Sequence, residues 1–345
     1  MIKRIFIFLV LGLGISCVDP ISIENNSEVQ VLVVEGGITT EYGPHKIKLS
    51  NSAKYGDIFA GVIQPVLSAK LLIRDEFGNV VQLVNAGKGY YETPETFKGE
   101  VGRTYTLVII KSNGDEYMSY PETIHKVAKI DSIYYKYKEL PIGAGANEAE
   151  IVSGVDIMVR VSDPGEEKNY YKWESSGTYR IKTNPELYTP PRSRNPQPKD
   201  CCEICYINEN NIMLSVASDI LFNSNIHQQN VLFLEDDGAR FSEKYVLILE
   251  QISLTKEAYN FYDLLKNQIG IDGDIFDPPA AKIRGNILSI SNPNEEIVGY
   301  FTASDVQRDT LQINGENLPK VKPQKTIPDD CRVLKNSTAV RPVFW

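Results

Sequence analysis

Apolar and polar residues alternate along the first third of the chain, in short runs that end at turn residues. Alternation with a period of two is typical of a half-buried β-strand. Turn sequences such as Gly87-Lys88-Gly89 separate the runs. Seven short strands in about 95 residues fit an immunoglobulin-like or transthyretin-like β-sandwich, which we predict over residues 29–125. The runs cover Val29–Gly36, His45–Ser50, Val66–Asp75, Val80–Asn85, Tyr90–Glu92, Thr104–Lys111 and Glu116–Ser119.

A second β-rich domain is predicted over residues 126–315. One segment there has helical spacing: Thr255 can cap it, Glu257 lies in its first turn, and apolar residues recur at Ala258, Phe261 and Leu265. We therefore predict a mainly β fold with one inserted α-helix, near residues 256–268. The tail, residues 316–345, is predicted to be irregular. The expected strands of this second domain are Val155–Val161, Tyr170–Ile181, Asn211–Ser215, Gln229–Leu234, Lys244–Ser253, Ile283–Ser291 and Glu296–Ala303.

The N-terminal residues predict a lipoprotein leader. Lys3 and Arg4 precede an apolar segment that stops at Gly14-Ile15-Ser16, directly before Cys17. This segment is too short to span a bilayer. We expect residues 1–16 to be removed as a signal peptide and Cys17 to carry the lipid, since each buried methylene contributes about 0.8 kcal/mol to membrane binding. Residues 17–28 would be a lipidated tether. The alternative is an ordinary secretory signal with a coincidental cysteine.

The charge of the chain argues against nucleic acid as a partner. The formal net charge is -9, and removal of Lys3 and Arg4 with the leader makes it -11. A polyanion would be repelled by such a protein.

Four further cysteines predict two disulfides in an exported protein: Cys201, Cys202, Cys205 and Cys331. Because adjacent cysteines pair only through a strained ring, we favour one short bridge, near Cys201 to Cys205, and one long bridge to Cys331. The alternative is half a zinc site at Cys202-x-x-Cys205, but a second close pair is missing. We predict no metal.

No catalytic pattern stands out. The three histidines are isolated in sequence, and no zinc-protease, nucleophile-elbow or phosphate-loop pattern is present. We predict no catalytic residue, and no cofactor besides the covalent lipid on Cys17.

A proline-rich loop has a charge opposite to that of the whole chain. It carries Arg192, Arg194 and Lys199 and five prolines, which hold a segment extended. Arginine is enriched in protein interfaces, so the loop predicts docking on a partner. The alternative is an ordinary solvent-exposed loop that binds no partner. The five prolines are Pro185, Pro190, Pro191, Pro196 and Pro198.

Several separated motifs resemble, in order, a lipoprotein family of Bacteroidota that is classed only as domain-of-unknown-function family 4249. The resemblance implies a lipobox cysteine, a β-rich body and genes placed beside SusC-like TonB-dependent receptors. It supplies no catalytic residues. The motifs are Leu32–Thr39, Gly43–His45, Ile47–Ser50, Tyr245–Leu247, Leu254–Tyr259, Asp274–Pro278, Gly285–Ile287, Gly299–Ser304 and Arg341–Trp345.

Together these observations predict a non-enzymatic lipoprotein anchored to the outer membrane and facing the cell exterior. We expect it to be an accessory subunit of a large complex, bound to an integral outer-membrane β-barrel protein and to other surface lipoproteins. The barrel would be a TonB-dependent transporter or an outer-membrane assembly or secretion machine. The alternative is a lipoprotein that binds a glycan or peptide nutrient and delivers it to a SusC-like transporter. A surface hydrolase is the third class.

Overall fold

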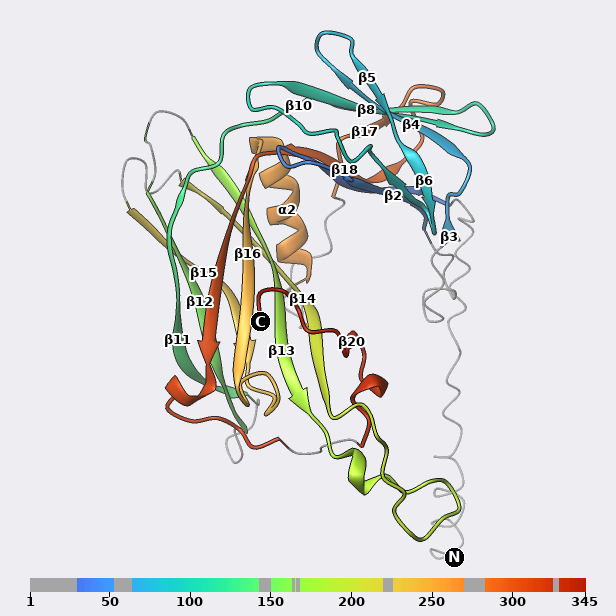
Figure 1. Cartoon of the computed structure of the whole chain (residues 1–345). Coiled ribbons are helices and arrows are strands. Elements are labelled where there is room, and N and C mark those ends of the chain that lie inside the picture. The colour runs from blue at the N-terminus through green and yellow to red at the C-terminus, as the bar shows by residue number, and fades with distance from the viewer. Residues whose placement is uncertain are drawn as a thin grey trace, which may run out of the picture.

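Two β-sandwiches lie end to end in the structure, a computed structural model, with an α-helix beside their junction (Figure 1). The structure describes residues 30–52, 64–142, 150–162, 165, 168–219, 226–269, 283–324 and 329–345. The described residues confirm the predicted fold class: a mainly β chain with an N-terminal sandwich, a second β-rich part and one inserted helix. The predicted signal peptide, lipid site and tether, residues 1–28, lie outside the described residues.

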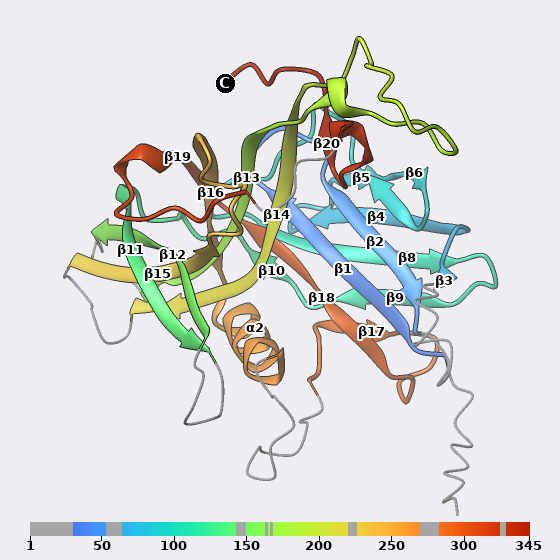
Figure 2. The same ribbon diagram turned by 90° about the horizontal axis from the view of Figure 1, so that it is seen from below.

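The first sandwich consists of two stacked six-stranded sheets (Figure 2). One sheet has the order β18-β1-β2-β7-β6, with β3 paired to β2, and the other has the order β17-β9-β8-β4-β5, with β10 paired to β8. Alternate residues such as Leu107 and Ile109 are fully buried between the sheets, as period-two strands require. The strands are β1 (Leu32–Thr39), β2 (Lys46–Asn51), β3 (Gln64–Pro65), β4 (Ala69–Asp75), β5 (Val80–Gln82), β6 (Val84–Gly87), β7 (Tyr90–Glu92), β8 (Thr104–Lys111), β9 (Glu116–Ser119), β10 (Glu122–Thr123), β17 (Ile287–Ser289) and β18 (Ile297–Ser304).

Two strands from late in the chain complete this first sandwich. β18 runs parallel to β1, from Leu32↔Ile297 to Thr39↔Ser304, and β17 pairs with β9. The sequence assigned both strands to the second domain, residues 126–315, but their hydrogen-bonded neighbours belong to the first sandwich. Pairing between strands so far apart in sequence leaves no local pattern, so periodicity alone could not place them.

The second sandwich has a three-stranded sheet, β11-β12-β15, facing a five-stranded sheet, β19-β16-β13-β14-β20. Its core between the sheets includes Trp173, Tyr245 and Leu247, all at most 2% exposed. β-Strands therefore build this part, as predicted. The strands are β11 (Ile130–Ile142), β12 (Glu150–Ser162), β13 (Tyr170–Lys182), β14 (Ile204–Ser218), β15 (Ile226–Glu235), β16 (Lys244–Leu254), β19 (Val306–Asn314) and β20 (Ser337–Thr338).

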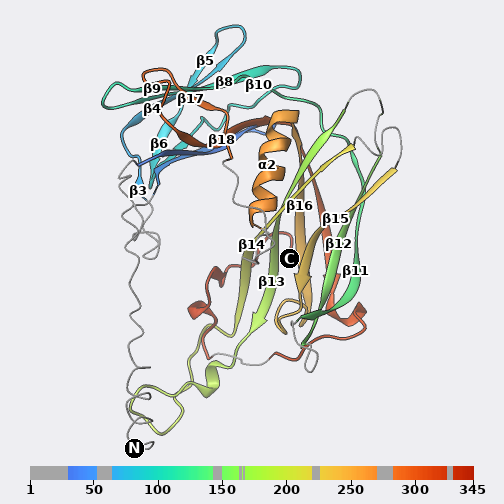
Figure 3. The same cartoon turned by 180° about the vertical axis from the view of Figure 1, so that it is seen from behind.

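Helix α2 (Lys256–Ile269) confirms the helix predicted near residues 256–268. The Thr255 hydroxyl accepts a hydrogen bond of 3.2 Å from the Ala258 N–H, the expected N-terminal cap. Ala258 and Phe261 are buried against Tyr300 of β18 and the outer face of β13 and β14. The helix thus joins the two sandwiches (Figure 3).

A buried carboxylate also links the two sandwiches. Glu122, only 3% exposed, accepts hydrogen bonds from the hydroxyls of Tyr300 (2.6 Å) and Thr255 (2.8 Å) and from the Asn286 amide (3.2 Å). Burial raises the pKa of Glu122, and the three hydrogen bonds oppose that rise. Strands of the first sandwich and Thr255, which follows β16 of the second sandwich and caps α2, therefore converge on one acid.

Candidate functional site

The proline-rich loop forms a projecting arm, which we define as residues 183–203, between β13 and β14. It lies at the end of the second sandwich farthest from the first sandwich (Figures 1 and 3). The arm begins with a short 3-10 turn, Pro185–Leu187. Its position leaves its tip accessible to a partner.

Hydrogen bonds across the arm hold its two sides together. The Gln197 N–H donates to the Tyr188 carbonyl at 2.7 Å, and the Lys199 N–H donates to the Pro185 carbonyl at 3.1 Å. At the base, the Thr183 N–H donates to the Glu203 carbonyl at 2.7 Å. The five prolines restrict the backbone between these bonds. The arm is therefore a defined structure, and binding would cost it little conformational entropy.

Lys199 makes contacts within the chain itself, with two aspartates of the C-terminal tail and with a tyrosine ring of the arm. Its Nζ lies 3.3 Å from Asp330 Oδ2, 3.6 Å from Asp329 Oδ2 and 3.8 Å from the centre of the Tyr188 ring. Hydrogen bonds from the Arg332 side chain and backbone, with a further one from Lys199, lower the pKa of Asp330. Of the three predicted partner-binding residues, Lys199 thus fastens the arm to the C-terminal tail.

Arg192 and Arg194 lie at the exposed tip of the arm. Both are exposed, and neither forms an ion pair with another residue of the described ranges. They are the only charged side chains between Tyr188 and Pro198. The tip therefore carries two positive charges on a chain whose net charge is -9.

The disulfides fix the base of the arm, in a pairing that differs from the expected one. Cys205 is bonded to Cys331, 126 residues further along, and both are fully buried. Cys201 is bonded to Cys202, so the favoured short bridge from Cys201 to Cys205 is wrong. The reason is local: Cys205, on β14, lies in the core of the second sandwich beside Cys331, and the backbone of Cys202 has a left-handed φ of 73°. The long bridge to Cys331 agrees with the prediction.

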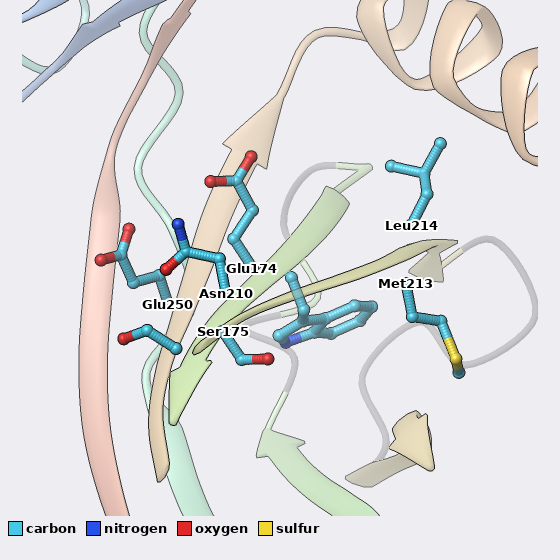
Figure 4. Close-up of a pocket in the computed structure, with 8 residues that line it drawn as sticks. Glu174, Ser175, Asn210, Met213, Leu214 and Glu250 are labelled. Atoms are coloured by element: carbon cyan, nitrogen blue, oxygen red, sulfur yellow. The ribbon is translucent and has the colours of Figure 1, made fainter. Parts of the chain in front are cut away.

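A second candidate lies on the outer face of the five-stranded sheet, in a hollow of about 440 Å³ that we call the sheet hollow. Figure 4 shows the Glu174, Glu250 and Asn210 side chains grouped on one side of it and Met213 and Leu214 on the other. The carboxylates are paired: Glu174 with Lys172 at 2.7 Å and Glu250 with Arg308 at 2.9 Å. Burial disfavours the Lys172 ammonium, but Tyr262 and Glu174 outweigh burial and raise its pKa.

Sequence reasoning did not find this hollow. Its polar residues come from three strands and share a face only because of strand register, and no short motif contains them. The ion pair between Lys199 and Asp330 was also missed, since the tail was predicted to be irregular and tied to the body only through Cys331.

The described part of the chain contains neither a metal-binding cluster nor a membrane-spanning helix. No group of three or more His, Cys, Asp or Glu side chains in these ranges is arranged to hold a metal ion. Among the helices described, none is both long enough and apolar enough to cross a bilayer.

Comparison with known proteins defines the class of the chain. The family model described as "Domain of unknown function (DUF4249)" matches residues 18–310, so the chain belongs to this family. The resemblance seen in the sequence motifs is thereby confirmed. No curated protein matches the chain.

Proposed function

We propose that this protein is a non-enzymatic lipoprotein of the outer membrane, lipidated at Cys17 and exposed at the cell surface. Its role is to dock on an integral β-barrel protein as an accessory subunit. The observation that carries the proposal is the arm: a fixed projection with two unpaired arginines at its tip.

The arm has the properties of a preformed docking element. The Cys205–Cys331 bridge, the Lys199–Asp330 pair and the hydrogen bonds across the arm fix its base before any partner is present. A rigid element loses little entropy on binding, so more of its interaction energy becomes affinity. Arginines that become desolvated at the centre of an interface are frequent hot spots.

The positive charge of the arm tip indicates that the partner presents an acidic surface to it. The chain has a net charge of -9, so an acidic partner is repelled by most of the molecule and attracted by the tip. This local attraction would steer the two proteins as they approach, so that Arg192 and Arg194 reach the partner first. Membership in the family and the predicted lipobox support a location beside membrane proteins.

Copurification from detergent-solubilised outer membranes tests the proposal. The tagged wild-type chain should bring down one integral β-barrel protein in fixed stoichiometry. Replacing both arginines, Arg192→Ala with Arg194→Ala, should lower partner affinity by about 30-fold, the equivalent of about 2 kcal/mol. The melting temperature should not change.

The matched control removes two exposed cations from the first sandwich, Lys70→Ala with Arg74→Ala. This variant should recover the partner as well as the wild type does. Recovery of the wild-type chain as a monomer, or equal recovery by the arm variant and the control, would contradict the proposal.

A further inference from the structure

The sheet hollow arises from an interruption of the β13–β14 ladder. Trp173 pairs with Ser215 and Ser175 pairs with Asn211, so Glu174 alone faces three residues of β14, positions 212–214. Such extra residues form a β-bulge, which bends the strand and changes the direction of its side chains. β-Bulges are frequent beside functional sites. Here Met213 and Leu214 of the interrupted segment line the hollow.

Strand register brings four polar residues to one face. Glu174 is directly opposite Glu250 on β16, and Ser176 is directly opposite Asn210 on β14. Since alternate residues of a strand share a face, Glu174 and Ser176 point the same way. Residues directly opposite have Cβ atoms about 5 Å apart. The four side chains therefore form a compact polar group.

These groups retain unused hydrogen-bonding capacity. Within the described residues, the side chains of Ser176 and Asn210 make no hydrogen bond. Each carboxylate uses one oxygen, Glu174 Oε1 for Lys172 and Glu250 Oε1 for Arg308. The hollow thus offers carboxylate acceptors together with hydroxyl and amide groups that donate and accept.

Each carboxylate of the hollow already has a cation beside it. Lys172 pairs with Glu174, and Arg308 pairs with both Glu250 (2.9 Å) and Glu41 (2.7 Å). Three carboxylates lie against two cations, so an anion is disfavoured, and a cation would have to displace Lys172 or Arg308. A neutral ligand rich in hydroxyl groups matches this lining, because each hydroxyl can donate to a carboxylate and accept from Asn210 or Ser176. The apolar side chains of Met213 and Leu214 would cover the C–H faces of such a ligand.

An extended peptide fits less well. Peptides add to sheets through an unpaired strand edge, whereas β13 is hydrogen-bonded to β16 on one side and β14 on the other. The volume, about 440 Å³, lies in the range of small-molecule sites. We infer that the sheet hollow binds a neutral saccharide of one or two sugar units, through Glu174, Glu250, Ser176 and Asn210. This site is independent of the arm and of the docking role.

Titration of the full-length protein in detergent with four disaccharides tests this inference: maltose, cellobiose, lactose and N,N′-diacetylchitobiose. At least one should bind saturably with a Kd below about 1 mM. The double variant Ser176→Ala with Asn210→Ala removes two hydrogen-bonding groups and should weaken that binding by at least about 10-fold. Asn294→Ala, an exposed amide of the first sandwich, is the matched control and should bind like the wild type.

Three results would overturn the inference. The first is no saturable binding of any of the four sugars. The second is saccharide binding that the double variant leaves unchanged, since the site would then lie elsewhere. The third is binding of the tripeptide Ala-Ala-Ala by the wild type but of none of the sugars.

Discussion

Lys199 Nζ lies 3.3 Å from Asp330 Oδ2, an ion pair that joins the arm to a residue 131 positions further along the chain. Asp330 also accepts hydrogen bonds from the Arg332 backbone N–H and guanidinium, at 3.0 and 2.9 Å. The neighbouring Cys331 is bonded to Cys205 at the start of β14. The tail therefore acts as a clasp on the base of the arm, and the arm's fixed direction depends on residues far from it in sequence.

Loss of the clasp should loosen the arm without unfolding the body. In Lys199→Ala, the Gln197 amide, which donates across the arm to Tyr188, should exchange its hydrogen up to about 5-fold faster, because a partly exposed ion pair contributes about 0–1 kcal/mol. Hydrogen-exchange mass spectrometry measures this. Lys182→Ala is the control. Lys182 pairs with Glu203, but both side chains are largely exposed to solvent, at 66% and 53%, so loss of this pair should change the exchange rate less. Faster exchange in the control than in Lys199→Ala would argue against the clasp.

The two disulfides should differ in access to reductant. Cys201 is exposed, whereas Cys205 and Cys331 are fully buried. Mild dithiothreitol should open the Cys201–Cys202 bond first, and alkylation followed by peptide mass mapping should label only that pair. Labelling of Cys205 and Cys331 before the adjacent pair would show that the pairing or the burial is wrong.

Removal of the long bridge should destabilise the fold strongly. A cross-link between positions 126 residues apart restricts the unfolded chain, and its loss is expected to cost about 5 kcal/mol. Guanidinium unfolding of Cys331→Ala against the wild type measures the difference. A loss below about 1 kcal/mol would mean that the bridge adds little to stability.

The buried Glu122 should make stability depend on pH. Burial raises the pKa of Glu122 in the folded state above its ordinary value of 4.5, so the folded protein keeps this proton after the unfolded chain has lost it. The free energy of unfolding therefore falls as the pH rises from 4.5 to the raised pKa. Glu122→Gln lacks this titration, so the variant should gain stability relative to the wild type across the same interval. Parallel pH profiles in urea unfolding would contradict this assignment.

Lipidation at Cys17 predicts a specific loss of membrane attachment. Cys17→Ala should not incorporate radiolabelled palmitate and should leave an unprocessed or soluble product. Cys201→Ala is the control and should keep the label. A Cys17→Ala protein that stays in the membrane with the normal mature mass would exclude the lipoprotein assignment.

Local patterns predicted most of the elements. Period-two runs located strands such as β8 and β16, and the Thr255 cap with the apolar spacing after it located α2 within one residue at its end. β19 was missed because its sequence, Val306–Asn314, is largely polar and only one of its residues, Ile313, is buried. It becomes a strand by pairing with β16, a tertiary effect that overrides local preference.

Long-range relationships were the part that the sequence could not supply. The parallel pairing of β18 with β1, the choice of Cys205 as the partner of Cys331 and the Lys199–Asp330 pair all depend on the folded arrangement. The same holds for the sheet hollow, whose residues meet through the register of β13, β14 and β16. Arg192 and Arg194 could be selected from sequence because their charge contrasts with that of the whole chain.

Photo-crosslinking in living cells is the most direct test of docking through the arm. A benzoyl-phenylalanine at position 195, in place of the exposed Asn195, lies beside both arginines and leaves them intact. Irradiation should join the chain to one integral outer-membrane β-barrel protein, identified by mass spectrometry. The same probe in place of Asn294, on the first sandwich, should give no such adduct. An adduct from position 294 with none from position 195 would contradict the account.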